Sequence, residues 1–167
     1  MFLPIKGAVL ANTCYKDGEL VAKDVTLTLP SVNYRTAEHN AMGVMELPMQ
    51  GQIEAMEASV TKKGYDTGLA KLAKPEPMSL EFRFVQDSID SNNVSSPEGC
   101  RVFMRAVPKT LPGSDLEPGE VGETQITFAV TRYQLFVGGE EICLIDQLNG
   151  IQRIYGTDYA KSINSLL

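Results

Sequence analysis

The sequence predicts a mainly-β fold, an antiparallel β-barrel or sandwich with a long hairpin and one or two short helices. Several segments alternate apolar and polar residues with the two-residue period of a half-buried strand, most clearly 78–85 and 124–137. Tight-turn dipeptides separate such segments, namely Asp17-Gly18, Gly138-Gly139 and Asn149-Gly150. Only two short stretches carry helix signals, so strands joined by hairpins dominate.

The first third of the chain predicts an arm, a strand and a hairpin. Residues 1–16 are irregular in pattern and are expected to form an N-terminal arm. Residues 25–29 alternate apolar and hydroxyl side chains, and Pro30 ends this strand. Residues 43–62 stay extended, with Gly51 as the bend, and predict a long hairpin that has one polar, acidic face and one apolar face. Such a long edge needs a covering partner.

The middle of the chain predicts a short helix and two strands between loops. Asp66 or Thr67 caps a helix over 68–74, which Pro75 stops. The alternating strands are 78–85 and 100–106, and the polar loops are 86–99 and 108–122.

The C-terminal part predicts three strands and a closing helix. The strands are 124–137, 140–146 and 151–155. Thr157 or Asp158 is expected to cap the helix, which places Tyr159, Ile163 and Leu166 on one face. The total is about seven to nine strands, and no repeat or linker divides the single domain 1–167.

Composition excludes several classes of protein. The chain has 167 residues with 15 Lys and Arg against 21 Asp and Glu, a net charge of −6, which argues against a strongly basic nucleic-acid binder. No apolar run approaches the roughly 20 residues that span a bilayer, so no membrane anchor is expected. The N-terminus does not have the pattern of a signal peptide. Three separated cysteines without a CxxC spacing fit synthesis in a reducing cytoplasm.

Recognisable catalytic, metal and cofactor motifs are missing from the sequence. The one histidine, His39, lies in a polar stretch, and the cysteines lack zinc-site spacing. No phosphate-binding glycine loop occurs. Two carboxylate pairs, Glu54 with Glu57 and Glu140 with Glu141, are candidates for a hydrolase, but their spacing points the two members to opposite faces of a strand. The expectation is a protein with an interaction or structural role, without enzymatic activity or cofactor.

Methionines gather in the predicted hairpin, and two interpretations remain open for them. Met42, Met45, Met49 and Met56 either fill the core or form an adaptable interface between subunits, because methionine fits irregular contacts.

A distributed set of segments resembles the major tail tube protein of contractile-tailed bacteriophages, a family that also supplies the inner tubes of R-type bacteriocins. The segments that carry the resemblance are Asp17-Gly18, the strand 25–30, Glu38, Ala41-Met42-Gly43, the run 53–58 with its continuation to Gly64, Gly122-Glu123, Tyr133-Gln134-Leu135, Ile145-Asp146, Asn149-Gly150, Gly156-Thr157-Asp158 and the ending Leu166-Leu167. The resemblance covers most of the chain and is weakest across 65–121. The ending departs from the family pattern at Ser162 and Asn164.

The resemblance implies hexameric rings stacked into the inner tube of a contractile tail, a conduit for DNA ejection or membrane puncture. It implies sheath, baseplate and tail terminator proteins as partners, a place in the virion, and assembly in the bacterial host cytoplasm. DNA would pass through the lumen without specific binding. Residues expected at the inter-subunit hairpin and lumen are Glu46, Gln50, Gln52, Glu54, Met45, Met49 and Met56, and those expected in an arm between rings are Phe2, Leu3 and Ile5.

Other functions are compatible with the residues alone. A tube protein of a related secretion system would share this architecture. A small-molecule-binding barrel would need an enclosed apolar pocket and would stay monomeric. A tube protein is distinguished from it by head-to-tail self-association.

Overall fold

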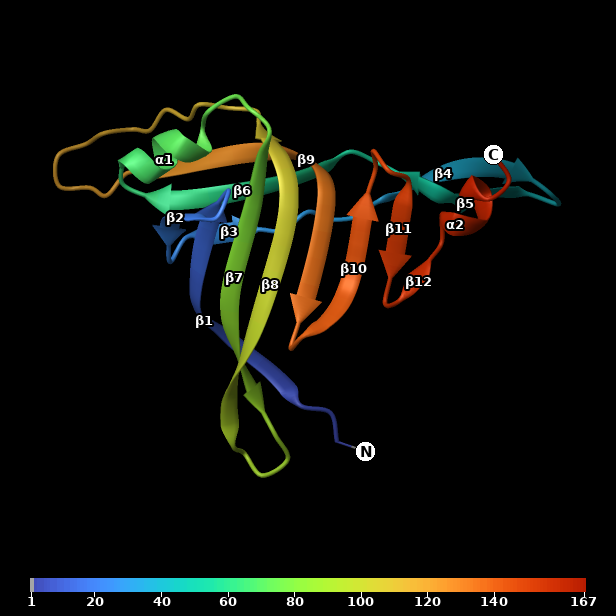
Figure 1. The fold of residues 1–167 in the computed structure, drawn as a ribbon, viewed down its shortest axis with the longest axis horizontal. Coiled ribbons are helices and arrows are strands. Elements are labelled where there is room, and N and C mark those ends of the chain that lie inside the picture. Colours follow the sequence, from blue (N-terminus) through green and yellow to red (C-terminus); the bar gives the residue numbers. More distant parts are fainter. Residues whose placement is uncertain (1) are drawn as a thin grey trace.

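The structure is a computed structural model that describes residues 2–167. It is mainly β, as predicted, with antiparallel pairing throughout (Figure 1). The elements are β1 Ile5–Lys16, β2 Glu19–Lys23, β3 Thr26–Thr28, β4 Tyr34–Asn40, β5 Val44–Ile53, β6 Met56–Lys63, α1 Thr67–Leu72, β7 Met78–Ile89, β8 Ser95–Pro108, β9 Glu123–Val137, β10 Glu140–Asp146, β11 Ile151–Ile154, β12 Thr157–Asp158 and α2 Lys161–Asn164.

One large sheet folds over itself at β9. Its main path runs β12-β11-β10-β9-β8-β7-β1-β2, and β6 joins β9 while β3 joins β6. The first half of β9 pairs with β6, from Glu123 to Val130, whereas its second half pairs with β10, from Arg132 to Val137. The register shifts beside Arg105 on β8, at the same level. A bulge bends a strand locally, so β9 turns from one layer into the other.

The core lies between these two layers and is built from alternate strand residues. Phe82 on β7 and Phe128 on β9 are both buried, and Val60 on β6 is inaccessible to solvent. Burial of each of the two phenylalanines contributes roughly 2–3 kcal/mol of transfer free energy. The opposite parity of these strands faces solvent, which explains the clear two-residue period of 78–85 and 124–137.

Helix α1 closes one end of the core, and the sequence prediction for it is confirmed. The carboxylate of Asp66 accepts a 3.0 Å hydrogen bond from the Leu69 amide, as an N-cap does. Leu69 and Leu72 are buried. A Cβ at Gly68 would lie 2.2 Å from the Val21 carbonyl oxygen, so only glycine allows this close approach to β2.

The long hairpin differs from the prediction in its bounds. Residues 43–62 are not its two arms, because β5 and β6 follow each other in one direction. β5 pairs with β4, and β6 pairs with β3. The turn is Ala41-Met42-Gly43, where the Ala41 amide donates to the Gly43 carbonyl and Met42 has a positive φ of 51°. Gly51 lies within β5 and is not the turn. The long hairpin therefore runs out through β3 and β4 and returns through β5 and β6.

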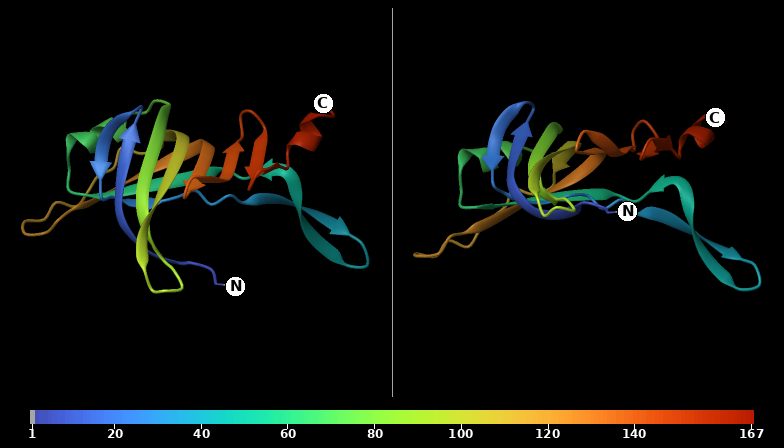
Figure 2. Two further views of the ribbon diagram at one scale, coloured as in Figure 1. Left: turned by 60° about the horizontal axis from the view of Figure 1, so that its bottom comes forward. Right: turned by 90° about the horizontal axis from the view of Figure 1, so that it is seen from below.

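The predicted loop 86–99 is largely strand. β7 and β8 pair without a register shift from Met78 opposite Ala106 to Ile89 opposite Ser95. Their polar ends project beyond the sheet as a twisted ribbon (Figure 2). The Asp90 carboxylate accepts hydrogen bonds from the amides of Asn92 and Val94 at the tip. Serine and asparagine content suggested a loop here, but an exposed ribbon has no apolar face that would produce alternation.

Both ends of the chain also differ from expectation. Residues 5–16, expected in an irregular arm, form β1 and pair with β7. Thr157 and Asp158, expected as a helix cap, form β12, and α2 starts at Lys161 with no side-chain cap. The closing helix is therefore a single turn, with Leu166 87% exposed.

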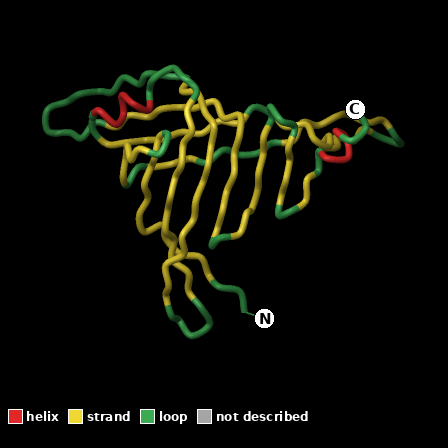
Figure 3. Tube along the Cα trace, viewed as in Figure 1, coloured by secondary structure: helices red, strands yellow, loops and turns green. Residues whose placement is uncertain are grey.

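Glycine turns and the second loop follow the prediction. Gly138 and Gly139 have φ values of 58° and 87°, which suits a two-residue hairpin turn between β9 and β10. Gly150 has a φ of 65° before β11. Residues 109–122 contain no helix or strand and extend as a long loop from the body (Figure 3).

Candidate self-assembly surfaces

The β4–β5 hairpin is a separate two-stranded sheet that projects from the body (Figures 1 and 2). Its apolar side chains are open to solvent: Met42 at the tip is fully exposed, and Val44 and Leu47 are 68% and 49% exposed. An isolated two-stranded hairpin is marginally stable in water. The hairpin therefore presents a surface that a neighbouring molecule would stabilise.

The two faces of this hairpin have different chemistry. Glu38 stands directly opposite Glu46, with Asn40 and Val44 as the next pair on the same parity. His39 stands opposite Met45 on the other face. One face is therefore acidic and the other largely apolar, whereas the sequence predicted two such faces for a hairpin over 43–62.

Hydrogen bonds fasten the base of the hairpin to the C-terminal part of the chain. The Gln50 side-chain amide donates to the Tyr159 carbonyl over 2.7 Å. The Gln147 side-chain amide donates to the Glu54 carbonyl over 3.1 Å, and the Glu54 amide donates to the Asn33 carbonyl. These bonds hold the exit of β5 in one direction relative to β11 and α2.

The polar residues predicted for the lumen fall into two groups. Glu46, Gln50 and Gln52 are all exposed on β5, but the register shifts between Pro48 and Ile53, so Gln50 and Gln52 lie outside the regularly paired part that carries Glu46. Glu54 is also exposed but lies in the connection between β5 and β6. Whether any of them faces a lumen stays a prediction.

The methionines predicted for the inter-subunit hairpin separate into surface and core. Met45 is 42% exposed on β5. Met49 is half-buried and lines a hollow of about 400 Å³ beside Tyr34 and Tyr159. Met56 is 2% exposed in the core, so its assignment to an interface is wrong. Its register opposite Val130 on β9 directs it inward.

The residues predicted for an arm between rings lie at the start of the chain. Phe2 and Leu3 precede β1, and Ile5 is its first residue, with 59% of its surface exposed.

The outer edge of β1 is partly unpaired, which the sequence pattern does not indicate. β2 covers β1 only from Thr13 to Lys16, which leaves the outer edge of residues 5–11 without a strand partner within residues 2–167. Val9 and Leu10 on this edge are more than half exposed.

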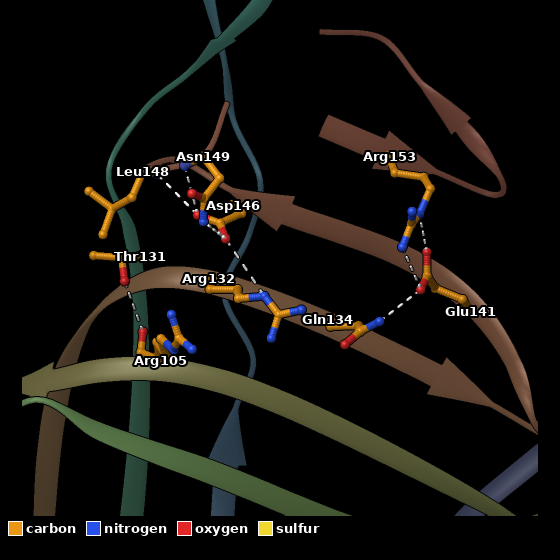
Figure 4. Close-up of polar contacts among 9 residues, drawn as sticks. All are labelled: Arg105, Thr131, Arg132, Gln134, Glu141, Asp146, Leu148, Asn149 and Arg153. Carbon is orange, nitrogen blue, oxygen red and sulfur yellow. Dashed lines mark hydrogen bonds and ion pairs between the residues drawn. The ribbon is translucent and has the colours of Figure 1, made fainter. Parts of the chain in front are cut away.

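A polar cluster on the sheet surface joins β9, β10 and β11 (Figure 4). Arg153 donates from Nε to Glu141 over 2.6 Å, and Gln134 donates to the same carboxylate over 2.7 Å. The Arg153 hydrogen bond, opposed by partial burial, lowers the pKa of Glu141. The Asp146 carboxylate caps the following turn by accepting from Asn149. These contacts fix the last strands and do not converge on an open site.

The candidate catalytic and metal-binding residues do not assemble into a site. Within residues 2–167, no group of three or more His, Cys, Asp or Glu side chains is arranged to hold a metal ion. Glu57 pairs with Lys109, whereas Glu141 pairs with Arg153. Burial raises the pKa of the Cys14 thiol to about 12. No helix in the described part of the chain has the length and apolarity to cross a membrane.

Known sequences are similar to this chain over most of its length. The model of the family described as phage tail tube protein FII matches residues 8–167. The tail tube protein of Escherichia phage P2 is 29% identical over 143 residues, which covers 83% of this chain and 81% of that protein.

Solved structures share the fold. The sheath–tube complex of the extracellular contractile injection system PVC, in its extended state, contains a chain with a TM-score of 0.55 at 14% identity, which covers 78% of this chain and 91% of that one. The tube-terminating cap of the anti-feeding prophage contains another, with a TM-score of 0.56 at 14% identity and coverage of 82% and 95%.

Proposed function

The chain belongs to the phage tail tube protein FII family and is a structural tail tube component, and on that premise we propose that its copies associate head to tail into hexameric rings that stack as the hollow inner tube of a contractile tail. The role is structural and requires no catalysis or cofactor. The tube would serve as a conduit for DNA ejection or for membrane puncture.

The observation that carries the ring proposal is the projecting β4–β5 hairpin. The hairpin, whose apolar side chains are exposed, lies at one end of the molecule, and the 109–122 loop lies at the opposite end (Figure 2). A surface that finds its complement elsewhere on an identical molecule makes a heterologous contact, which closes into a ring when the rotation permits. The unpaired edge of β1 at residues 5–11 supplies a second surface for contact between copies.

The partners follow from the same role. The similar solved chains come from a sheath–tube complex and a tube-terminating cap. We infer that this chain likewise contacts a sheath protein along its length and terminator and baseplate proteins at its ends. Assembly takes place in the cytoplasm of the bacterial host, and the finished tube is part of the virion or particle.

The acidic composition suits a conduit. Six chains of net charge −6 give a ring a formal charge of −36. A net negative ring repels phosphates, whereas DNA adheres to surfaces that neutralise its phosphates with lysine and arginine. DNA would therefore pass without specific binding in a phage tail.

Electron microscopy of the purified protein over a range of concentrations tests the proposal. We expect hollow rings or tubes, either spontaneously or after addition of a baseplate extract that supplies an initiator. A protein that stays monomeric in both conditions, with its fold verified by circular dichroism, would overturn the proposal.

A further inference from the structure

Four arginines gather on the outer face of the main sheet, and we name them the arginine face: Arg83, Arg101, Arg105 and Arg132. Arg83 on β7 stands directly opposite Arg101 on β8. Arg105 on β8 stands directly opposite Arg132 on β9. Figure 4 shows this second pair on its neighbouring strands. The face thus contains two like-charge pairs on adjoining strands of a protein whose net charge is −6.

Like charges directly opposite on neighbouring strands destabilise a sheet unless counter-charges compensate them. Compensation within the chain is partial. Arg83 donates to Glu81 over 2.6 Å, and Arg132 lies 3.7 Å from the Asp146 carboxylate. Arg101 and Arg105 form no ion pair within residues 2–167, and both are exposed. The face therefore favours an anionic partner.

Aromatic side chains complete the arginine face. Phe103 lies between Arg101 and Arg105 on the same parity of β8, and it packs edge to face against Phe136 with ring centroids 5.9 Å apart. A hollow of about 690 Å³ opens beside both rings and is also lined by Arg83 and Arg101. A partner on this face would meet apolar surface as well as positive charge.

The hairpin presents the complementary arrangement. Glu38 and Glu46 stand directly opposite each other on β4 and β5, both exposed, and neither forms an ion pair within the described residues. Val44 and Pro48 share their parity on β5. Within one chain the hairpin extends away from β7 and β8, so this acidic pair does not reach the arginine face (Figures 1 and 2).

We propose that the arginine face of one copy receives the acidic face of the β4–β5 hairpin of a second copy, with Glu38 and Glu46 against Arg101 and Arg105. Each surface holds like charges in register, and contact between them relieves both repulsions at once. Charge complementarity sets the register and orientation of the contact. The inference rests on the proposed self-assembly and names the surfaces that carry it.

The hairpin fits this face better than the other acidic element, the 109–122 loop. That loop carries Asp115, Glu117 and Glu120 but has no regular structure. The hairpin is a two-stranded ribbon whose alternate side chains match the spacing of a sheet face, and its exposed apolar side chains have no covering partner within residues 2–167.

A charge swap between the two surfaces tests the proposal. The first variant combines Glu38→Arg with Glu46→Arg, the second combines Arg101→Glu with Arg105→Glu, and the third contains all four changes. The third variant has the same net charge as the unmodified protein. Asp115→Lys with Glu117→Lys is the matched control, since it makes the charge of two acidic residues positive outside the proposed contact. Circular dichroism and gel filtration verify the fold, and sedimentation with electron microscopy measures the critical concentration for tube formation.

We expect each of the first two variants to raise the critical concentration by about tenfold or more, because close charge pairs at an interface contribute strongly to affinity. The third should restore assembly close to the unmodified level, and the loop control should leave it unchanged. Normal assembly of either two-site variant overturns the inference. A loss of assembly that the third variant does not restore also overturns it. The same holds if the loss caused by Arg101→Glu with Arg105→Glu is restored by adding the two loop changes. If the unmodified protein forms no tubes, the proposed function itself has failed.

Discussion

The Gln50 side chain donates a 2.7 Å hydrogen bond to the backbone carbonyl of Tyr159, which links the base of the projecting hairpin to the last strand-and-helix segment of the chain. A second, longer bond from the same amide reaches the Ser162 hydroxyl over 3.3 Å. Because Gln50 is more than a hundred residues from its partners, this contact sets a direction for the hairpin that local sequence does not determine. It connects the candidate assembly surface to the fold.

Gln50→Ala should loosen the hairpin without unfolding the body. A hydrogen bond of this kind contributes about 1 kcal/mol, a small share of the stability of a domain. We expect faster amide exchange in residues 34–53, a fall of only about 2–4 °C in the unfolding midpoint, and a higher critical concentration for assembly. Gln52→Ala is the control, because Gln52 has the same side chain two residues further along β5 and makes no side-chain hydrogen bond within residues 2–167. Equal behaviour of the two variants would remove the role given to Gln50.

Met56 and Met45 should respond differently to the same substitution. Met56→Ala should lower the free energy of unfolding by about 2–5 kcal/mol, as large-to-small core changes do. Met45→Ala should change it by about 0.5 kcal/mol or less, because Met45 is 42% exposed, but it should weaken assembly. Urea unfolding of the monomer and sedimentation of the assembled protein measure the two effects. A Met45→Ala protein that is as unstable as the Met56→Ala protein would contradict this division.

Truncation at the N-terminus should show where the fold begins. Removal of residues 1–4 should spare the fold, because β1 starts at Ile5. Removal of residues 1–12 should destabilise it strongly. That deletion takes most of the ladder between β1 and β7, together with Asn12, whose side chain exchanges two hydrogen bonds with the Val25 backbone over 2.6 and 2.9 Å. Thermal unfolding of the two truncated proteins decides the point. A stable protein without residues 1–12 would restore the interpretation of this segment as a peripheral arm.

Local signals in the sequence were sufficient for much of the fold. The glycines at 138, 139 and 150 have the positive φ that their turn positions require, and Asp66 caps α1 as its side-chain chemistry predicts. Strands with one buried face, such as β7 and β9, were found by alternation. β1 was missed because its first seven residues are exposed on both faces and therefore show no such pattern.

The candidate surfaces were harder to predict because they depend on pairing between distant strands. The sequence indicates that the hairpin has an acidic and an apolar face, but not that Glu38 faces Glu46. The sequence groups Met56 with Met45 because both lie in the predicted hairpin 43–62, and only the pairing of β6 with β9 separates them. The arginine pairs likewise arise from registers between β7, β8 and β9 that no local motif encodes.

The Glu141–Arg153 pair should make stability fall in acid. The hydrogen bond from Arg153 is the largest influence on Glu141 and holds the pKa of its carboxyl below the usual range, although partial burial opposes it. A carboxyl whose pKa is lower in the folded state stabilises the fold fully above the unfolded value of about 4.3, and this contribution is lost as the pH falls through the folded value. We therefore expect the free energy of unfolding to decrease from about pH 5 downward.

Glu141→Gln isolates this contribution, because the amide keeps the shape of the side chain and does not titrate. The variant should be less stable than the unmodified protein at pH 7, and the difference should shrink toward pH 3 as the carboxylate of the unmodified protein is protonated. Arg83→Gln is a useful comparison: it removes the Glu81 pair on the exposed sheet face, where surface ion pairs contribute little to stability. Urea unfolding at several pH values gives both curves. A difference between Glu141→Gln and the unmodified protein that stays constant from pH 7 to pH 3 would contradict the ionic role of Glu141, because packing alone does not depend on its charge.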